Sequence, residues 1–162
     1  MQYCKISEDR KGVLIGKDGK VKKEIEKMTK TKIYITDYVI IDGDPYGEIL
    51  AEQIISAINL GFSAEKALLL LNDNFSYEFI PISGKRSTEI KGRIIGRNGT
   101  TRNIIEKISN TYICVGDEGV GIIGNEDDVE DVKECIMMLI SGSTHGAAYR
   151  LLEKRMAEKR SF

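Results

Sequence analysis

The spacing of apolar positions along the chain predicts short strands and amphipathic helices. Short apolar or alternating segments, which are typical of β-strands, lie at 3–6, 32–35, 38–42, 77–82, 112–115 and 120–123. Apolar residues at helical spacing follow each of two Gly-x-x-Gly segments, at 16–19 and 96–99. We therefore expect a short helix to end at the first glycine of each segment and a second helix to begin at the other glycine.

A longer helix is predicted in each half of the chain. Asp44 is the expected N-cap of the first one, with Pro45 in the first helical position and Gly61 at the end. Asn125 is the expected N-cap of the second one, which has acidic residues in its first turn and ends at Gly142. A further helix is expected at 63–71 and at 144–159. Each half then has the order β-α-α-β-β-α and one extra helix.

The two halves are copies of one unit. Residues 11–35 align with residues 91–115 at an offset of 80, with ten identical positions. After one extra residue the match continues, because Gly61 corresponds to Gly142. The repeat predicts two similar domains. We place them at 1–72 and 75–162.

Composition and cysteine usage exclude several classes of protein. The 162 residues are 41% hydrophobic and 30% charged, as in soluble globular proteins. No apolar run reaches the ~20 residues that a membrane helix needs, and "MQYCKISEDRKG" lacks the layout of a signal peptide. Three cysteines without metal-ligand spacing favour a reducing compartment. We expect a cytoplasmic protein without cofactor or metal, with Cys114 and Cys135 in the core and His145 on the surface.

The net charge of −1 hides a sorted distribution. Residues 11–32 carry eight basic and three acidic residues, and residues 85–107 carry seven basic and two acidic residues. Residues 37–65 and 116–134, in contrast, carry six and eight acidic residues. Basic blocks on a near-neutral protein are a footprint for a polyanion, although charge blocks are also ordinary solvated faces.

The basic blocks coincide with the two Gly-x-x-Gly segments, "LIGKDGK" and "IIGRNGT". Glycines without Cβ allow a phosphodiester to approach the backbone, and the N–H groups at the start of the following helix suit a phosphate oxygen. Lys17 and Arg97 place a cation at the same point. The chemistry therefore favours a nucleic-acid backbone as ligand.

The order β-α-α-β-β-α with this loop between its first two helices resembles the type I KH domain. That resemblance implies an α+β fold of two tandem KH domains, each with a three-stranded sheet, helices on one face of the sheet and an extra helix at the end. It also implies that each loop clamps about four nucleotides of single-stranded nucleic acid.

One departure from the general KH pattern and one further segment narrow the resemblance. A basic residue, Lys22 or Arg102, stands three positions after the second glycine, where most KH domains have an apolar residue. The ending "LISGSTHGAAYRLLEKR" also resembles the Pno/Dim/Krr family of KH proteins in small-subunit ribosome assembly, in particular its archaeal Dim-like members. The resemblance implies binding to the 3′-end region of small-subunit rRNA. It further implies contacts with the Nob endonuclease and with the alpha subunit of translation initiation factor two.

The candidate RNA-binding residues lie in and beside the two loops. They are Gly16, Lys17, Asp18, Gly19, Lys20 and Lys22 in the first half, and Arg93, Ile95, Gly96, Arg97, Asn98, Gly99, Thr100 and Arg102 in the second half. Asp18 places an anion inside the first loop, where it opposes phosphate, whereas Asn98 is a neutral donor. We therefore expect the second loop to bind more strongly, and Gly96→Asp to remove binding without unfolding the domain.

Several other features allow more than one interpretation. The run Leu68–Leu71 and its counterpart Leu151-Leu152 are expected to pack between the domains, or to form a partner-binding patch. The basic segment 149–160 either extends the RNA surface or is an ordinary solvated helix. Ile113 and Val115 are expected to divide between a base-binding groove and the core.

One motif points elsewhere and is rejected. "GVGIIG" (119–124) matches the Gly-x-Gly-x-x-Gly of dinucleotide-binding proteins. Its counterpart in the first half, "YVIIDG", reads as a plain strand, and the acidic residues 126–128 would repel a pyrophosphate. With no catalytic constellation in the sequence, we expect a non-enzymatic RNA-binding protein. The alternative is a KH-fold protein–protein adaptor that binds RNA weakly.

Overall fold

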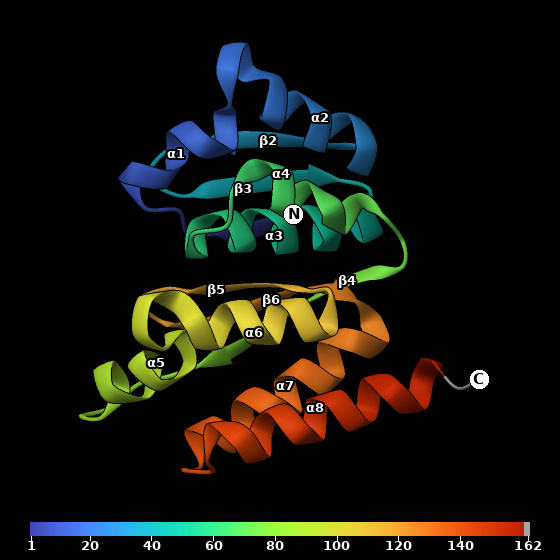
Figure 1. Ribbon diagram of the computed structural model, residues 1–162. Helices are drawn as coiled ribbons and strands as arrows, with labels where there is room; N and C mark the ends of the chain where they lie inside the picture. Colours follow the sequence, from blue (N-terminus) through green and yellow to red (C-terminus); the bar gives the residue numbers. More distant parts are fainter. Residues whose placement is uncertain (161–162) are drawn as a thin grey trace. The chain divides into compact units, whose positions relative to one another are not determined.

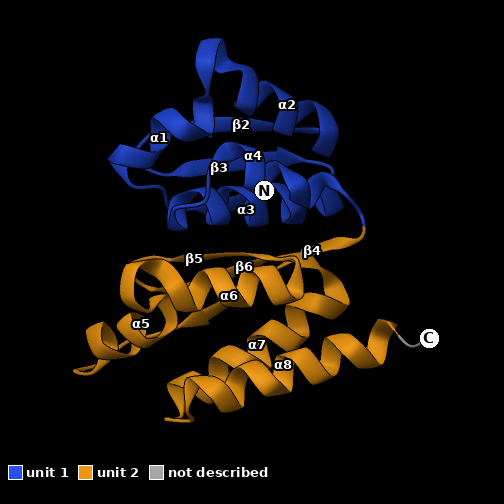
Figure 2. Ribbon diagram, viewed as in Figure 1, with its two compact units in different colours: residues 1–73 blue, residues 74–162 orange. Residues whose placement is uncertain are grey.

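The structure, a computed structural model, describes residues 1–160. The chain divides into two compact units, Met1–Asp73 (unit 1) and Asn74–Phe162 (unit 2), which are coloured separately in Figure 2. The last two residues of the predicted domain 75–162 lie outside the described residues. Each unit has its own sheet and its own covering helices, so the two units are described one at a time.

Both units have the predicted order of elements (Figure 1). Unit 1 consists of β1 (Gln2–Cys4), α1 (Glu8–Ile15), a 3₁₀ turn (Lys17–Gly19), α2 (Lys20–Thr29), β2 (Thr31–Ile35), β3 (Val39–Gly43), α3 (Pro45–Leu60), α4 (Ala64–Leu68) and a second 3₁₀ turn (Leu69–Leu71). Unit 2 consists of β4 (Phe75–Pro81), α5 (Ser87–Ile95), a 3₁₀ turn (Arg97–Gly99), α6 (Thr100–Ser109), β5 (Tyr112–Val115), β6 (Gly119–Asn125), α7 (Glu126–Ile140) and α8 (His145–Arg160). The expected α+β fold with two KH-like units is confirmed.

Each sheet is antiparallel and has its last strand in the middle, with the order β1-β3-β2 in unit 1 and β4-β6-β5 in unit 2. The pairing between strands explains why the ends of β1 and β4 differ from the predicted ends. β3 begins at Val39, which pairs with Cys4, so β1 ends there and does not reach residue 6. β6 extends over Gly119–Asn125, so β4 is correspondingly longer than predicted.

The helices of unit 1 pack against one face of its sheet. On that face Ile33, Val39 and Ile41 are buried, whereas Lys32 and Tyr34 on the other face are exposed. This alternation is the period of two that a half-buried strand requires. Unit 1 therefore has an open sheet face.

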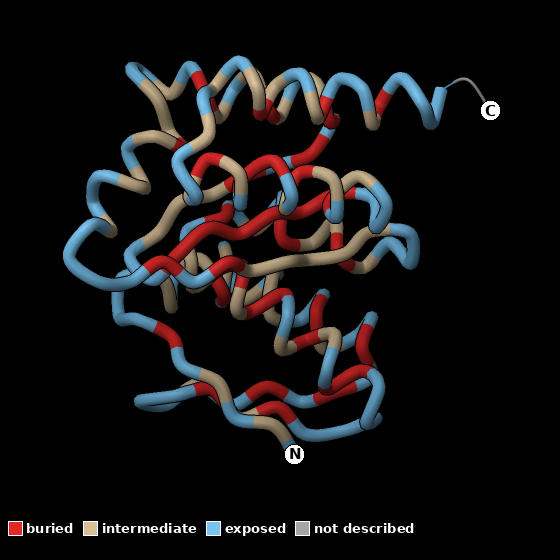
Figure 3. Tube along the Cα trace, turned by 90° about the horizontal axis from the view of Figure 1, so that it is seen from below, coloured by how far each residue is buried: buried red, intermediate tan, exposed pale blue. Residues whose placement is uncertain are grey.

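The core of unit 2 extends into the C-terminal helix. Ala148, Leu152 and Met156 are buried at intervals of four residues on α8 and join the cluster formed by α7 and the sheet. Figure 3 shows buried positions recurring along the helix that leads to the C-terminus. The expectation that Leu152 packs between the units is thus wrong, because its helical spacing directs it into the core of its own unit. In the matched leucine run Leu70 is buried, and Leu68, Leu69 and Leu71 are half-buried.

The two expected helix N-caps have different outcomes. Asp44 caps α3, since its Oδ2 accepts a hydrogen bond from the Gly47 N–H at 2.8 Å. Asn125 holds the N-cap position of α7, but its side chain makes no capping bond. The Glu126 N–H instead donates to the carbonyl of Asn74 at 3.2 Å.

Of the other predicted positions, Cys135 lies in the core, and burial raises the pKa of its thiol to about 12. Cys114 is only half-buried, because it alternates with Ile113 on β5 and faces away from the core. His145 is also half-buried, and its Nε2 lies 3.0 Å from the carbonyl oxygen of Arg93. It therefore contacts α5 and is not a plain surface residue.

The same polar contacts join helix and strand in both units. The Thr29 hydroxyl lies 2.8 Å from that of Thr31, and the Ser109 hydroxyl lies 2.8 Å from that of Thr111. All four side chains are buried, and buried hydroxyls need such partners. The repeat in the sequence is therefore also a repeat of buried hydrogen bonds.

Candidate nucleic-acid interface

Each Gly-x-x-Gly segment forms one tight turn between two helices. In unit 2 the φ angles of Gly96, Asn98 and Gly99 are 77°, 57° and 76°, all in the left-handed region. Glycine tolerates this region, and Asn and Asp enter it more readily than other residues. The loop of unit 1 has φ angles of 76°, 57° and 74° at Gly16, Asp18 and Gly19. The two loops therefore share one backbone shape and differ in their side chains.

The two glycines of a loop have different reasons to be glycine. A Cβ at Gly96 would overlap Thr101, with its backbone N 2.6 Å away. A Cβ at Gly99 would find its nearest neighbour, Arg102 Nη2, at 3.7 Å. The first glycine is thus required by packing, and only the second lies beside open space.

This packing contradicts the expectation that Gly96→Asp would leave the fold intact. The Asp side chain would be forced against Thr101, which is 5% exposed and belongs to α6. The same limit applies at Gly16, where a Cβ would overlap Val21. A clean test of the loop must instead change the two residues between the glycines.

These two residues are exposed in both units: Lys17 and Asp18 in unit 1, Arg97 and Asn98 in unit 2. They begin the turn that leads into α2 or α6, and N–H groups at the start of a helix lack helical acceptors and attract anions. In unit 2 the Thr100 hydroxyl donates to the carbonyl of Arg97 at 2.6 Å. Thr100 therefore stabilises the backbone of the loop, and the side chain of Arg97 stays exposed.

A second cation lies beside the second glycine in each unit. In unit 2 it is Arg102, whose Nε lies 4.0 Å from Glu106 and whose Nη2 reaches the side of Gly99. In unit 1 the expected residue, Lys22, pairs with Glu26 at 3.3 Å. The cation beside the second glycine of unit 1 is Lys23 instead, whose Cε lies 3.6 Å from the position that a Cβ would occupy on Gly19.

Sequence analysis missed Lys23 and its counterpart Asn103, whose Nδ2 lies 3.9 Å from the Cβ position of Gly99. Helical spacing was the available signal, since residues four apart on a helix share a face. Lys20 is exposed at the first position of α2, as expected for a residue of the loop region.

The side chain of Arg93 contacts the end of α7. Its guanidinium donates to the carbonyl of Leu139 and, at 2.6 Å, to that of Ser143. Leu139 lies in the last turn of α7 and Ser143 follows the helix, so Arg93 adds a donor to carbonyls at and just beyond the helix end. In unit 1 Arg10 does the same for the end of α3, donating to Ile58 and Phe62. The Arg93 guanidinium is thus engaged by carbonyls of its own unit, and its role in RNA binding stays a prediction.

Two apolar residues directly precede the loop of each unit. Leu14 and Ile94 are in the core, whereas Ile15 is 39% exposed and Ile95 is half-buried. Ile95 therefore keeps its place among the candidates. Ile113 and Val115 both pack against the core, so the expectation that one faces a groove is wrong. Residues two apart on a strand share a face.

Other candidate chemistries have no support in the described part of the chain. "GVGIIG" forms β6, which is paired with β4 and β5 over its length, and is not a phosphate-binding turn. Among residues 1–160, no cluster of His, Cys, Asp and Glu has the arrangement of a metal site. No helix within the same residues has both the length and the apolar character to cross a membrane.

Comparison with known proteins agrees with this geometry. A family model described as the eukaryotic type KH domain (KH domain type I) matches residues 7–73 and again 78–157. KH domain-containing protein MJ0443 from Methanocaldococcus jannaschii is 37% identical over 95% of this chain and 73% of its own length. The pre-rRNA-processing protein PNO1 of Coccidioides immitis is 31% identical over 67% of this chain. The match covers 46% of that relative, so the chain spans about half of its length.

A solved structure is similar over the whole fold. The crystal structure of an a/eIF2alpha–aDim2p–rRNA complex from Pyrococcus horikoshii OT3 contains a chain that is 44% identical, with a TM-score of 0.85. The match covers 97% of this chain and 94% of the other. One KH model matches both units, and the relatives above are similar over most of the chain. The chain therefore belongs to the type I KH-domain family, as an archaeal Pno1/Dim2-like KH protein.

Proposed function

We propose that this chain is a single-stranded RNA-binding protein of small-subunit ribosome assembly that holds the 3′-end region of the small-subunit rRNA. The loop Gly96–Gly99 is the principal clamp. It would fix the rRNA end while a separate nuclease or factor acts on it.

One observation carries the proposal: both loops present the same left-handed turn at the start of a helix, with an exposed cation inside it and a second cation beside the second glycine. Such a turn recognises a phosphate backbone and leaves the bases to neighbouring surfaces. The second loop has no carboxylate, whereas Asp18 stands inside the first. Unit 2 is therefore the stronger binder.

The partners follow from the relatives. A Dim2p protein has been crystallised together with a/eIF2alpha and rRNA, and this chain resembles it over nearly its full length. We extend both partners, rRNA and the alpha subunit of translation initiation factor two, to this chain. A Nob-type endonuclease as partner and a cytoplasmic location stay predictions from the sequence.

The test exploits a match between the loops. Lys17→Asp in unit 1 and Arg97→Asp with Asn98→Asp in unit 2 both create the sequence Gly-Asp-Asp-Gly. Asp enters the left-handed region that Asn98 occupies, so both variants should fold. Affinity for an oligonucleotide with the 3′-terminal rRNA sequence is measured by fluorescence anisotropy. A scrambled oligonucleotide serves as the control ligand.

We expect the unit 2 variant to bind about tenfold more weakly or worse, because a charge-assisted contact is lost and two anions are added. The unit 1 variant should lose less. An equal or larger loss in unit 1 would overturn the ranking of the loops. Unchanged RNA binding in both variants, or an RNA affinity that does not depend on salt, would instead favour the alternative function of a protein–protein adaptor.

A further inference from the structure

A stripe of lysines runs along α2 of unit 1. Lys20, Lys23, Lys27 and Lys30 are exposed and spaced three, four and three residues apart, so they lie on one side of the helix. At the equivalent positions of unit 2 stand Thr100, Asn103, Lys107 and Asn110. Unit 1 therefore has four cations where unit 2 has one.

The stripe ends in a hollow of about 460 Å³ between the end of α2 and the start of β2. Lys23, Lys27, Lys30 and Lys32 line it, together with Glu26 and Asp42. Glu26 is occupied within the fold, since it accepts from the Ile33 N–H at 2.8 Å and pairs with Lys22. None of the four lysines of the hollow makes an ion pair within residues 1–160. The hollow therefore presents an excess of positive charge.

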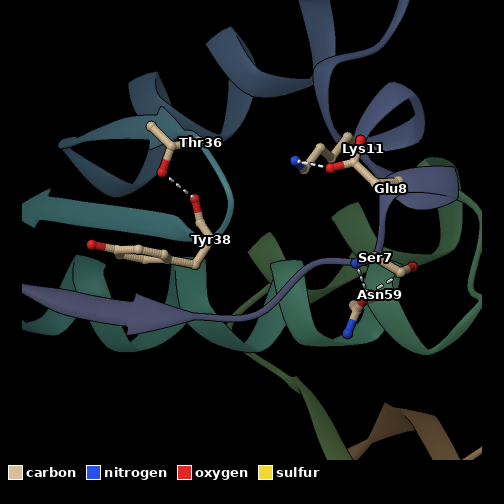
Figure 4. A network of polar contacts seen from close by, with 6 residues as sticks. All are labelled: Ser7, Glu8, Lys11, Thr36, Tyr38 and Asn59. Atoms are coloured by element: carbon tan, nitrogen blue, oxygen red, sulfur yellow. Dashed lines mark hydrogen bonds and ion pairs between the residues drawn. The ribbon is translucent and has the colours of Figure 1, made fainter.

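Lys32 connects this hollow to the open face of the unit 1 sheet. Lys32 and Tyr34 are two residues apart on β2 and share the outer face. Tyr34 and Tyr3 both pair with Ile40 of the central strand, so they flank it on that face. Tyr38 completes the group, with its ring centre 5.8 Å from that of Tyr3. In Figure 4 the Tyr38 ring lies on the viewer's side of the strands and α3 lies behind them.

These aromatic rings are available to a ligand. Tyr3, Tyr34 and Tyr38 are 58%, 54% and 45% exposed. The matching row of unit 2 is Phe79, Gly121 and Cys114, where no tyrosine stands and Gly121 is buried. On the sheet of unit 2 the exposed aromatic ring is Tyr112, which is 38% exposed, so the group of three exposed tyrosines distinguishes unit 1.

We propose that the lysine stripe of α2 and the tyrosine face of the sheet form a second surface for single-stranded RNA, outside the Gly-x-x-Gly clamps. Lys23, which lies beside Gly19, joins the surface to the first loop. Lysines neutralise phosphates and exposed rings stack on bases, the combination that binds single strands without strict sequence preference. This inference rests on the proposed RNA-binding function and gives unit 1 a role although Asp18 weakens its clamp.

The test uses the full chain and two oligonucleotides, a hexamer that fits one clamp and a 20-mer long enough to occupy both units. The first variant is Lys27→Gln with Lys32→Gln, and the second is Tyr34→Ala. The matched controls are Lys85→Gln with Lys133→Gln, and Tyr46→Ala, which removes an exposed tyrosine from α3. Circular dichroism confirms that each variant is folded.

We expect each unit 1 variant to bind the 20-mer about fivefold more weakly and the hexamer unchanged. The lysine variant should also lower the steepness of log K against log salt by about 1.4, because two phosphate contacts are lost. The control variants should bind both oligonucleotides like the parent protein.

Three outcomes overturn the inference and separate it from the proposed function. If the 20-mer binds all variants equally while Arg97→Asp with Asn98→Asp still weakens binding, the second surface is wrong and the clamp stands. If the parent protein binds neither oligonucleotide, the proposed function itself fails. If Tyr34→Ala changes the oligomeric state in light scattering and not RNA binding, the sheet face is a protein interface.

Discussion

The carboxylate of Glu106 accepts a hydrogen bond from the backbone N–H of Ile113, with 2.8 Å between Oε2 and N. Ile113 lies on the edge strand β5, so this N–H has no strand partner on that side. Glu26 makes the same bond to Ile33 at 2.8 Å in unit 1. One glutamate in each unit therefore ties the helix that follows the Gly-x-x-Gly loop to the neighbouring strand.

Glu106→Ala is expected to lower the free energy of unfolding by about 1–3 kcal/mol, because the strand N–H loses its charged acceptor. Glu106→Gln keeps an acceptor oxygen and should cost less. Urea denaturation of the two variants measures the difference. Equal losses for Ala and Gln would show that the bond contributes nothing specific.

Gly96→Ala and Gly99→Ala should separate packing from contact with the ligand. Ala at Gly96 meets Thr101 and adopts a positive φ, with an expected loss of stability of about 2–4 kcal/mol. Ala at Gly99 has open space and should lose about 1–2 kcal/mol from the left-handed conformation alone. We expect Gly99→Ala to remain folded and to bind RNA more weakly, as measured by thermal denaturation and anisotropy. A Gly96→Ala variant as stable as the parent protein would contradict the conclusion that packing against Thr101 requires glycine at this position.

Arg93 and Arg97 should show opposite effects on substitution. Arg93→Ala removes the guanidinium donor from the carbonyls of Leu139, which keeps the Gly142 N–H, and Ser143. This loss should lower stability by about 1–3 kcal/mol. The salt dependence of RNA binding should not change. Arg97→Ala should leave stability unchanged and make the salt dependence less steep by about 0.7. If Arg93→Ala alters the salt dependence as much as Arg97→Ala, Arg93 is an RNA-binding residue as well.

Asp18→Asn gives the first loop the neutral residue that the second loop has. Removing the anion beside the phosphate position should strengthen RNA binding by unit 1, about threefold to tenfold at low salt. The effect is clearest in a chain whose second loop carries Arg97→Asp with Asn98→Asp. No gain there would mean that Asp18 is not what weakens the first clamp.

Alkaline pH should destabilise the protein through Cys135. Burial raises the pKa of this thiol to about 12 in the folded state, whereas it is about 8.5 in an unfolded chain. Between pH 8.5 and 10 the unfolded chain therefore loses a proton that the folded chain keeps. The free energy of unfolding falls by up to about 1.4 kcal/mol per pH unit from this group. Cys135→Ala should show a correspondingly shallower decline in denaturation at several pH values. If the free energy of unfolding falls with pH equally steeply in the parent protein and in Cys135→Ala, ionisation of Cys135 is not the cause.

Local patterns were enough for the fold. The offset of 80 between the two halves, the left-handed glycines at helix ends and the cap at Asp44 are short-range features, so the order of elements and the two loops could be predicted from them. The family followed from the same stretches, because "IIGRNG" and the basic residue at Arg102 carry the resemblance.

The roles of single side chains could not be predicted in this way. Arg93 is engaged by carbonyls 46 and 50 residues later in the chain, and Gly96 is constrained by the packing of Thr101. The open tyrosine face of unit 1 depends on Tyr3, Tyr34 and Tyr38 meeting across three strands.

The sequence by itself thus determined the repeated α+β unit, the two Gly-x-x-Gly loops and the family. Tertiary structure alone decided which cations stay free for a ligand and which sheet face stays open. The reason is physical: backbone conformation responds to neighbouring residues, whereas the partners and the exposure of a side chain are set by residues far away in the chain.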